Sequence, residues 1–128
     1  MKVLLDTHTY LWFRKSPKLL PEPVLDLLTN STVEVFISVV TPWELAIKAG
    51  IGKLNVTDLL VDLESRESAA GFSFAPISTA QAIRSGLLPL HHRDPFDRLL
   101  AAQALDLRIP IVSRDRVFDL YRVKRIWD

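Results

Sequence analysis

The sequence contains no cysteine, so it can form neither disulfide bonds nor thiolate metal sites, and we expect a protein of the reducing cytoplasm. It has no uninterrupted run of about 18 apolar residues, so we expect no membrane span. The N-terminal stretch has one lysine and then an aspartate within its apolar run, which is not typical of a signal peptide. The 16 basic and 15 acidic residues leave a net charge of +1, so overall charge does not indicate a nucleic-acid-binding protein.

The chain has enough apolar residues for one packed domain over residues 1–128. Hydrophobic residues make up 48% of the sequence, which argues against disorder. Short apolar runs alternate with segments of helical spacing and predict an α/β domain, with a mainly parallel central sheet flanked by helices. We expect strands at 2–5, 33–40, 72–77 and 109–112, and an edge strand at 121–126. We expect helices at 7–14, 23–29, 42–50, 56–70 and 78–87, another beginning at 95, and a single turn at 117–120.

One helix start carries an acid toward the interior. Asp94 is a good N-cap, Pro95 suits the first helical position, and Asp97 falls at the third. The apolar run that follows has little polar face and predicts a buried helix. The residues from Thr41 to Glu44 repeat this pattern, with Thr41 as the expected cap. Taken alone, each third-position acid is explained by a capping box or the helix dipole.

Four acids nevertheless fall where the ends of parallel strands should meet. Asp6 directly follows the first strand, Glu44 lies in the first turn after the second, and Asp115 follows the fourth. Asp97 begins the helix expected to pack on this sheet. Ligands of such sheets bind beyond the carboxyl ends of the strands. Asp6 is the hardest of the four to explain structurally, because aspartate is disfavoured at a buried strand end without a partner.

Several carboxylates so close together would repel one another unless a divalent cation were bound among them. Mg²⁺ and Mn²⁺ prefer oxygen ligands, and such a site can activate water for attack on a phosphodiester. Arg98, Arg114 and Arg116 could hold phosphates, but they could equally neutralise the acids or lie in solvent. The adjacent His91 and His92 make poor joint ligands, and His8 is more often a structural histidine than a substrate contact. No aromatic interleaving favours base stacking.

Four segments together resemble PIN-domain ribonucleases of the VapC toxin type. They are Leu5-Asp6-Thr7-His8 with Leu11-Trp12, Ser38-Val39-Val40-Thr41-Pro42-Trp43-Glu44, the segment from Asp94 to Gln103 (DPFDRLLAAQ), and Ser113-Arg114-Asp115 with Phe118. The resemblance implies a PIN-like fold and a Mg²⁺- or Mn²⁺-dependent endoribonuclease. The implied catalytic and metal-binding residues are Asp6, Glu44, Asp97 and Asp115. Asp97 takes the third acidic position because it directly precedes the Leu-Leu-Ala-Ala run, which leaves Asp94 as the cap.

The resemblance also implies partners and accessory residues. Proteins of this type are typically homodimers, are inhibited by a cognate antitoxin in a hetero-oligomer, and act on RNA. The possible substrate-binding or accessory residues are Thr7, Ser38, Arg98, Ser113, Arg114 and Arg116. Ser113 departs from the threonine that is common at its position. The apolar surface left by Trp12, Trp43 or Leu59 and Leu60 could receive an antitoxin tail that folds on binding.

Three other functions share parts of this pattern. A Mg²⁺-binding receiver domain would need a pair of adjacent acids after the first strand and a lysine where Arg114 stands. A haloacid-dehalogenase-like phosphatase would need a second aspartate where His8 stands. A catalytically silent PIN-like module that binds RNA or a partner is disfavoured by the presence of all four acids. The site rather than the fold decides among these.

Overall fold

A five-stranded parallel sheet forms the centre of the computed structural model, which describes residues 1–128. The strands are β1 (Lys2–Leu5), β2 (Glu34–Ser38), β3 (Ser73–Ala75), β4 (Ile111–Val112) and β5 (Arg125–Ile126). Their order is β3-β2-β1-β4-β5, and every neighbouring pair is parallel. The predicted α/β class and parallel sheet are confirmed. The order differs from the 2-1-3-4-5 arrangement of receiver domains, which argues against that alternative.

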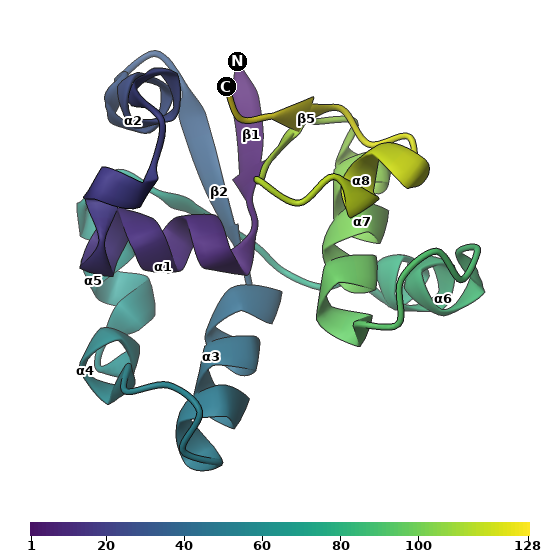
Figure 1. Ribbon diagram of the computed structural model, residues 1–128, viewed down its shortest axis with the longest axis horizontal. Helices are drawn as coiled ribbons and strands as arrows, with labels where there is room; N and C mark the ends of the chain where they lie inside the picture. The colour runs from purple at the N-terminus through teal and green to yellow at the C-terminus, as the bar shows by residue number, and fades with distance from the viewer.

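Helices cover both faces of the sheet (Figure 1). They are α1 (Thr7–Lys15), α2 (Glu22–Thr29), α3 (Val40–Gly50), α4 (Thr57–Leu60), α5 (Leu63–Ala69), α6 (Thr79–Leu87), α7 (Pro95–Leu107) and α8 (Val117–Leu120), with a 3₁₀ helix at Pro17–Leu19. In Figure 1, α1, α2, α4 and α5 lie on one side of β1 and β2, while α6, α7 and α8 lie on the other. No helix combines the length and the hydropathy needed to cross a lipid bilayer.

Alternating side chains of β1 divide the core into two halves. Val3 and Leu5 are buried in a cluster with α1, α2 and α5, whereas Leu4 is buried in a second cluster with α7 and α8. This alternation is the two-residue period of a strand buried on both faces, which is why the whole run is apolar. The carboxyl end of β1 therefore emerges between two packed helical layers.

Two predicted helix starts are confirmed by their caps. The Asp94 carboxylate accepts hydrogen bonds from the backbone N–H groups of Phe96 (2.8 Å) and Asp97 (3.3 Å), and α7 then buries every residue from 98 to 104. Ser78 and Gln81 form a reciprocal capping box at the start of α6. Because caps are local hydrogen bonds, a sequence pattern can identify them.

Two other helix predictions are wrong. Thr41 does not cap α3, which begins at Val40 because the Ser38 hydroxyl at the end of β2 accepts the Val40 N–H at 3.0 Å. Glu44 consequently lies in the second turn rather than in a capping box. The single helix predicted over 56–70 is interrupted between α4 and α5, where Asp62 has a left-handed φ of 49°. Strands β3, β4 and β5 are also shorter than predicted.

A buried ion pair joins α1 to α5. Glu67 is fully buried, and its carboxylate accepts hydrogen bonds from the Tyr10 hydroxyl and from the Arg14 guanidinium, whose Nε lies 2.8 Å from Oε2. Burial opposes the charge of Glu67, but the hydrogen bonds from Arg14 and Tyr10 prevail and lower its pKa. Burial, together with the Glu67 carboxylate, raises the pKa of Tyr10 to about 12. The pair fixes the first helix after β1 and hence the end of that strand.

Candidate metal centre

Asp6 lies at the point where β1 becomes α1, and its carboxylate is held from two sides. Oδ1 accepts the Thr9 N–H at 2.7 Å as the N-cap of α1, and Oδ2 accepts the hydroxyl of Ser113. Only 5% of the residue is exposed. Burial raises its pKa above the ordinary value, although these hydrogen bonds act in the opposite direction. The fold thus carries a carboxylate into a place where its charge is not fully compensated.

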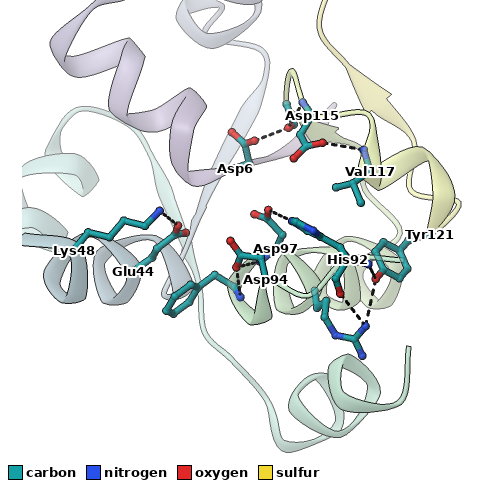
Figure 2. Close-up of polar contacts among 12 residues, drawn as sticks. Asp6, Glu44, Lys48, His92, Asp94, Asp97, Asp115, Val117 and Tyr121 are labelled. Carbon is teal, nitrogen blue, oxygen red and sulfur yellow. Dashed lines mark hydrogen bonds and ion pairs between the residues drawn. The ribbon is translucent and has the colours of Figure 1, made fainter. Parts of the chain in front are cut away.

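Ser113 connects Asp6 to Asp115. The Ser113 hydroxyl also accepts the Asp115 N–H at 2.9 Å, and Asp115 Oδ1 accepts the Val117 N–H at 3.0 Å (Figure 2). Asp115 is exposed and lines a pocket that Asp6 also lines. One buried hydroxyl therefore orders the two acids that follow β1 and β4.

Glu44 projects from α3 and is 2% exposed. Its Oε2 pairs with Lys48 Nζ, one turn further along the helix, at 2.5 Å. Its Oε1 is the only buried side-chain nitrogen or oxygen in the protein without a hydrogen-bond partner. A buried carboxylate oxygen without a partner is costly, so its presence indicates a ligand that completes the site.

The pKa of Asp97 shows that these acids interact electrostatically. Its pKa is raised to about 6, chiefly by burial and then by the charge of Asp94, with further contributions from the charges of Asp6 and Glu44. Figure 2 shows these side chains, which come from α7, the start of α1 and α3, together with Asp115 around one space. The four acids that we expected near the ends of the parallel strands thus lie around one space in the structure. Mutual repulsion of this kind is relieved by a bound cation.

His92 is a further member of this cluster, and sequence reasoning missed it. Its Nε2 lies 2.8 Å from Asp97 Oδ2, and this contact favours the charged form of Asp97. One ligand atom from each of His92, Asp94 and Asp97 lies within 4.8 Å of the others. His91 points elsewhere, against the ring of Tyr121, as expected for adjacent histidines. The only signal in the sequence was the spacing from His92 to Asp97 across a helix start.

Comparison with known proteins places this fold in a family. The model of the PIN domain matches residues 3–124. The chain belongs to the PIN domain family. Among solved structures, VapBC2 from Rickettsia felis bound to a promoter DNA fragment has a TM-score of 0.72 at 17% identity, with 100% of both chains covered. DNA-bound VapBC from Salmonella typhimurium has a TM-score of 0.71 at 22% identity, covering 100% of this chain and 98% of that chain. VapBC-1 from nontypeable Haemophilus influenzae has a TM-score of 0.66 at 19% identity, covering 98% and 97%. No curated protein matches the sequence.

Two of the predicted accessory residues of this PIN domain, Thr7 and Ser38, make contacts between helices or strands. The Thr7 hydroxyl lies 3.4 Å from that of Thr41, and both residues are buried where α1 meets α3. The Ser38 hydroxyl donates to the Gln103 side chain of α7 and also holds the start of α3. These contacts position the elements that carry Asp6 and Glu44.

Arg98 is buried and directed away from the space between the acids. Its two terminal nitrogens donate to the Tyr121 hydroxyl and to backbone carbonyls of the last turn of α6 and of the segment that joins α6 to α7, at 2.9–3.4 Å. Those carbonyls belong to Ser85, Gly86, Leu88, Pro89 and His92. Because its donors are engaged within the protein, the structure gives Arg98 an anchoring role rather than the phosphate contact that we considered.

Proposed function

We propose that this PIN domain is a VapC-type toxin of a type II toxin–antitoxin system, a Mg²⁺- or Mn²⁺-dependent endoribonuclease. The observation that carries the proposal is the Oε1 of buried Glu44, which has no hydrogen-bond partner. It faces Asp6 and Asp97, whose pKa values are raised because burial disfavours their charged forms. A purely structural cluster would have been completed by protein donors. The unpartnered oxygen supports a bound cation as the missing partner.

The donor set fits a hard divalent cation. Asp6, Glu44, Asp97 and Asp115 would hold it, and all four offer carboxylate oxygens, which Mg²⁺ and Mn²⁺ prefer. When bound, such an ion lowers the pKa of a coordinated water and stabilises the leaving oxygen of a phosphodiester. Ser113 orients Asp6 and Asp115, and His92 holds Asp97 by hydrogen bonding, as residues behind metal ligands commonly do.

The substrate in this proposal is RNA within the cytoplasm. Arg114 and Arg116 are exposed, border the pocket beside Asp6 and Asp115, and make no ion pair within the protein. Guanidinium groups in this position can bind the phosphates on either side of the cleaved bond.

The proposed partners are a cognate antitoxin and a second copy of the chain. The similar folds of the VapBC structures motivate the antitoxin proposal. A row of exposed apolar side chains also runs along α3 and its end, formed by Trp43 (49% exposed), Ile47 (40%) and Ile51 (63%). Residues four apart share one helix face, so this row suits the apolar side of an antitoxin tail that orders on binding.

The test is cleavage of total RNA by the purified chain with Mn²⁺ and with EDTA. We expect cleavage that requires the metal and is lost in Asp97→Asn. The matched control is Asp26→Asn, because Asp26 is an exposed aspartate on α2 far along the chain from the acids, and it should cleave like the wild type. Full activity in Asp97→Asn would refute the site. A folded wild-type chain that binds Mn²⁺ but cuts no RNA would favour a silent binding module.

A further inference from the structure

A pocket of about 340 Å³ opens beside the candidate metal centre. It is lined by Asp6, His8, Trp12, Arg114, Asp115 and Arg116. Two of these are proposed metal ligands, two carry aromatic rings and two are cationic. The pocket therefore combines carboxylate, aromatic and guanidinium side chains from the N-terminal and C-terminal parts of the chain.

The aromatic side chains form a continuous series. His8 and Trp12 are four residues apart on α1 and share one helix face, with ring centroids 5.8 Å apart and planes inclined by 42°. Trp127, which follows β5, extends the series from the other side, 6.0 Å from Trp12. Trp127 is more than 100 positions away from His8 and Trp12 in the sequence, so the full series forms only in the folded protein.

The exposure of these rings is not explained by packing alone. Trp12 and Trp127 are partly buried against the first core cluster, but Trp12 also lines the pocket, and His8 is exposed. Trp12 therefore both packs on the core and presents part of its ring to the pocket. Here an aromatic surface is left open directly beside Asp6.

Arg114 and Arg116 line the same pocket from the loop that follows β4. The loop that carries them is ordered by the Ser113 hydroxyl and by the Asp115 carboxylate, each of which accepts a backbone N–H. Arg14 and Arg125 pair with acids, and Arg98 is bound to carbonyls, whereas Arg114 and Arg116 have no such partner. Asp6 and Asp115 repel an anion. The guanidinium groups of Arg114 and Arg116 would offset this repulsion for an anion that must bind close to those acids.

We propose that this pocket binds an unpaired nucleotide of the RNA next to the cleaved phosphodiester. Its base stacks on the surface formed by His8 and Trp12, and its phosphate contacts Arg114 and Arg116. This inference rests on the proposed ribonuclease function and assigns the recognition of the base and of the phosphate to named side chains of this pocket. A base inside a duplex is already stacked on both faces and cannot reach Trp12.

The test measures the binding of a fluorescein-labelled 12-nucleotide RNA, single-stranded or as a duplex, to the full chain in EDTA. We expect Trp12→Leu to raise the Kd for the single strand by about 5- to 100-fold, and Trp12→Phe to restore binding to within about 3-fold, since phenylalanine keeps a stacking face. The Kd for the duplex should not change. Leu87→Ala, at an exposed apolar residue of α6 outside this pocket, is the control and should bind like the wild type.

Salt dependence tests the arginines separately. The double variant Arg114→Gln/Arg116→Gln should reduce the slope of log Kd against log salt by about 1.4, because each lost phosphate contact on a single strand contributes about 0.7. Arg84→Gln, at an exposed arginine of α6 without an ion pair, should leave the slope unchanged.

The outcomes separate this inference from the proposed function. The nucleotide pocket is overturned if Trp12→Leu binds the single strand with the same Kd as the wild type, or if the variant raises the Kd for the duplex as much as that for the single strand. Either result counts even if the wild type cleaves RNA with Mn²⁺. Failure of the wild type to bind either form of RNA overturns the pocket as well. Failure of Mn²⁺-dependent cleavage, with Trp12-dependent binding intact, overturns only the nuclease.

Discussion

Asp97→Asn should make the metal-free protein more stable while it destroys the metal centre. The Asp97 side chain is 19% exposed, and burial and then the charge of Asp94 raise its pKa from 3.8 to about 6. Above pH 6 the folded state therefore holds this charge less favourably than the unfolded chain does. Asparagine keeps the shape and one hydrogen-bonding oxygen but removes the charge.

The magnitude follows from linkage. A raised pKa in the folded state means that stability is complete below the unfolded value and is lost as the pH rises through the folded value. For Asp97 the raised pKa lowers the free energy of unfolding by about 3 kcal/mol at pH 7.5 and by about 1 kcal/mol at pH 4.5, relative to a group with an unshifted pKa. Asp97→Asn should recover most of these amounts. Urea denaturation in EDTA at pH 7.5 should show a midpoint about 1–2 M higher than that of the wild type.

Excess Mn²⁺ should reverse this order, because a ligand that binds only the folded state stabilises the wild type and not the variant. The control Asp26→Asn removes the same charge from an exposed position and should change stability by less than about 0.5 kcal/mol. A destabilised Asp97→Asn protein in EDTA, or a gain that is the same at both pH values, would refute the reasoning that burial and the neighbouring acids disfavour the charge of Asp97.

Three further predictions concern the supports of the site. Glu67→Gln should lower the free energy of unfolding by about 3 kcal/mol at pH 7. Because the pKa of Glu67 is lowered in the folded state, the difference in stability between wild type and variant should shrink as the pH falls below the ordinary value of 4.5. Urea titrations at pH 7 and pH 3.5 would measure this difference. Arg98→Met leaves at least five carbonyls without their donor and should cost about 3–5 kcal/mol by the same assay, and a change below 1 kcal/mol would contradict the anchoring role. Ser113→Ala should weaken Mn²⁺ binding about 10-fold in calorimetry with an unchanged circular dichroism spectrum, and unaltered affinity would show that this hydroxyl does not position Asp6.

The sequence predicted most of the fold because its decisive signals are local. The Asp94–Pro95 cap, the Ser78 capping box and the apolar run of β1 each depend on neighbours within a few residues. The start of α3 was mispredicted because Ser38, a residue at the end of a strand, replaced Thr41 as the acceptor. No local pattern distinguishes these two hydroxyls.

The candidate site was predicted in part for the same reason. The positions of Asp6, Glu44 and Asp115 just after strands, and of Asp97 at a helix start, led us to expect the four acids at one edge, since ligands of parallel sheets bind beyond the carboxyl ends of the strands. His92 was missed because its position depends on contacts of the preceding loop with Tyr121 and Arg98, which packing alone determines. The series from His8 to Trp127 was missed because it joins the two ends of the chain.

The bond between Ser113 and Asp6 spans 107 positions of the sequence. A ribosome that has translated the first hundred residues has already made Asp6, Glu44 and Asp97, yet the hydroxyl that orders Asp6 and the Asp115 carboxylate do not exist until the last fifth of the chain is synthesised. An unfinished chain, or a fragment left by proteolysis, would therefore hold an incomplete centre. For an enzyme proposed to cut RNA, the centre would therefore be complete only after the segment that follows β4 has been made.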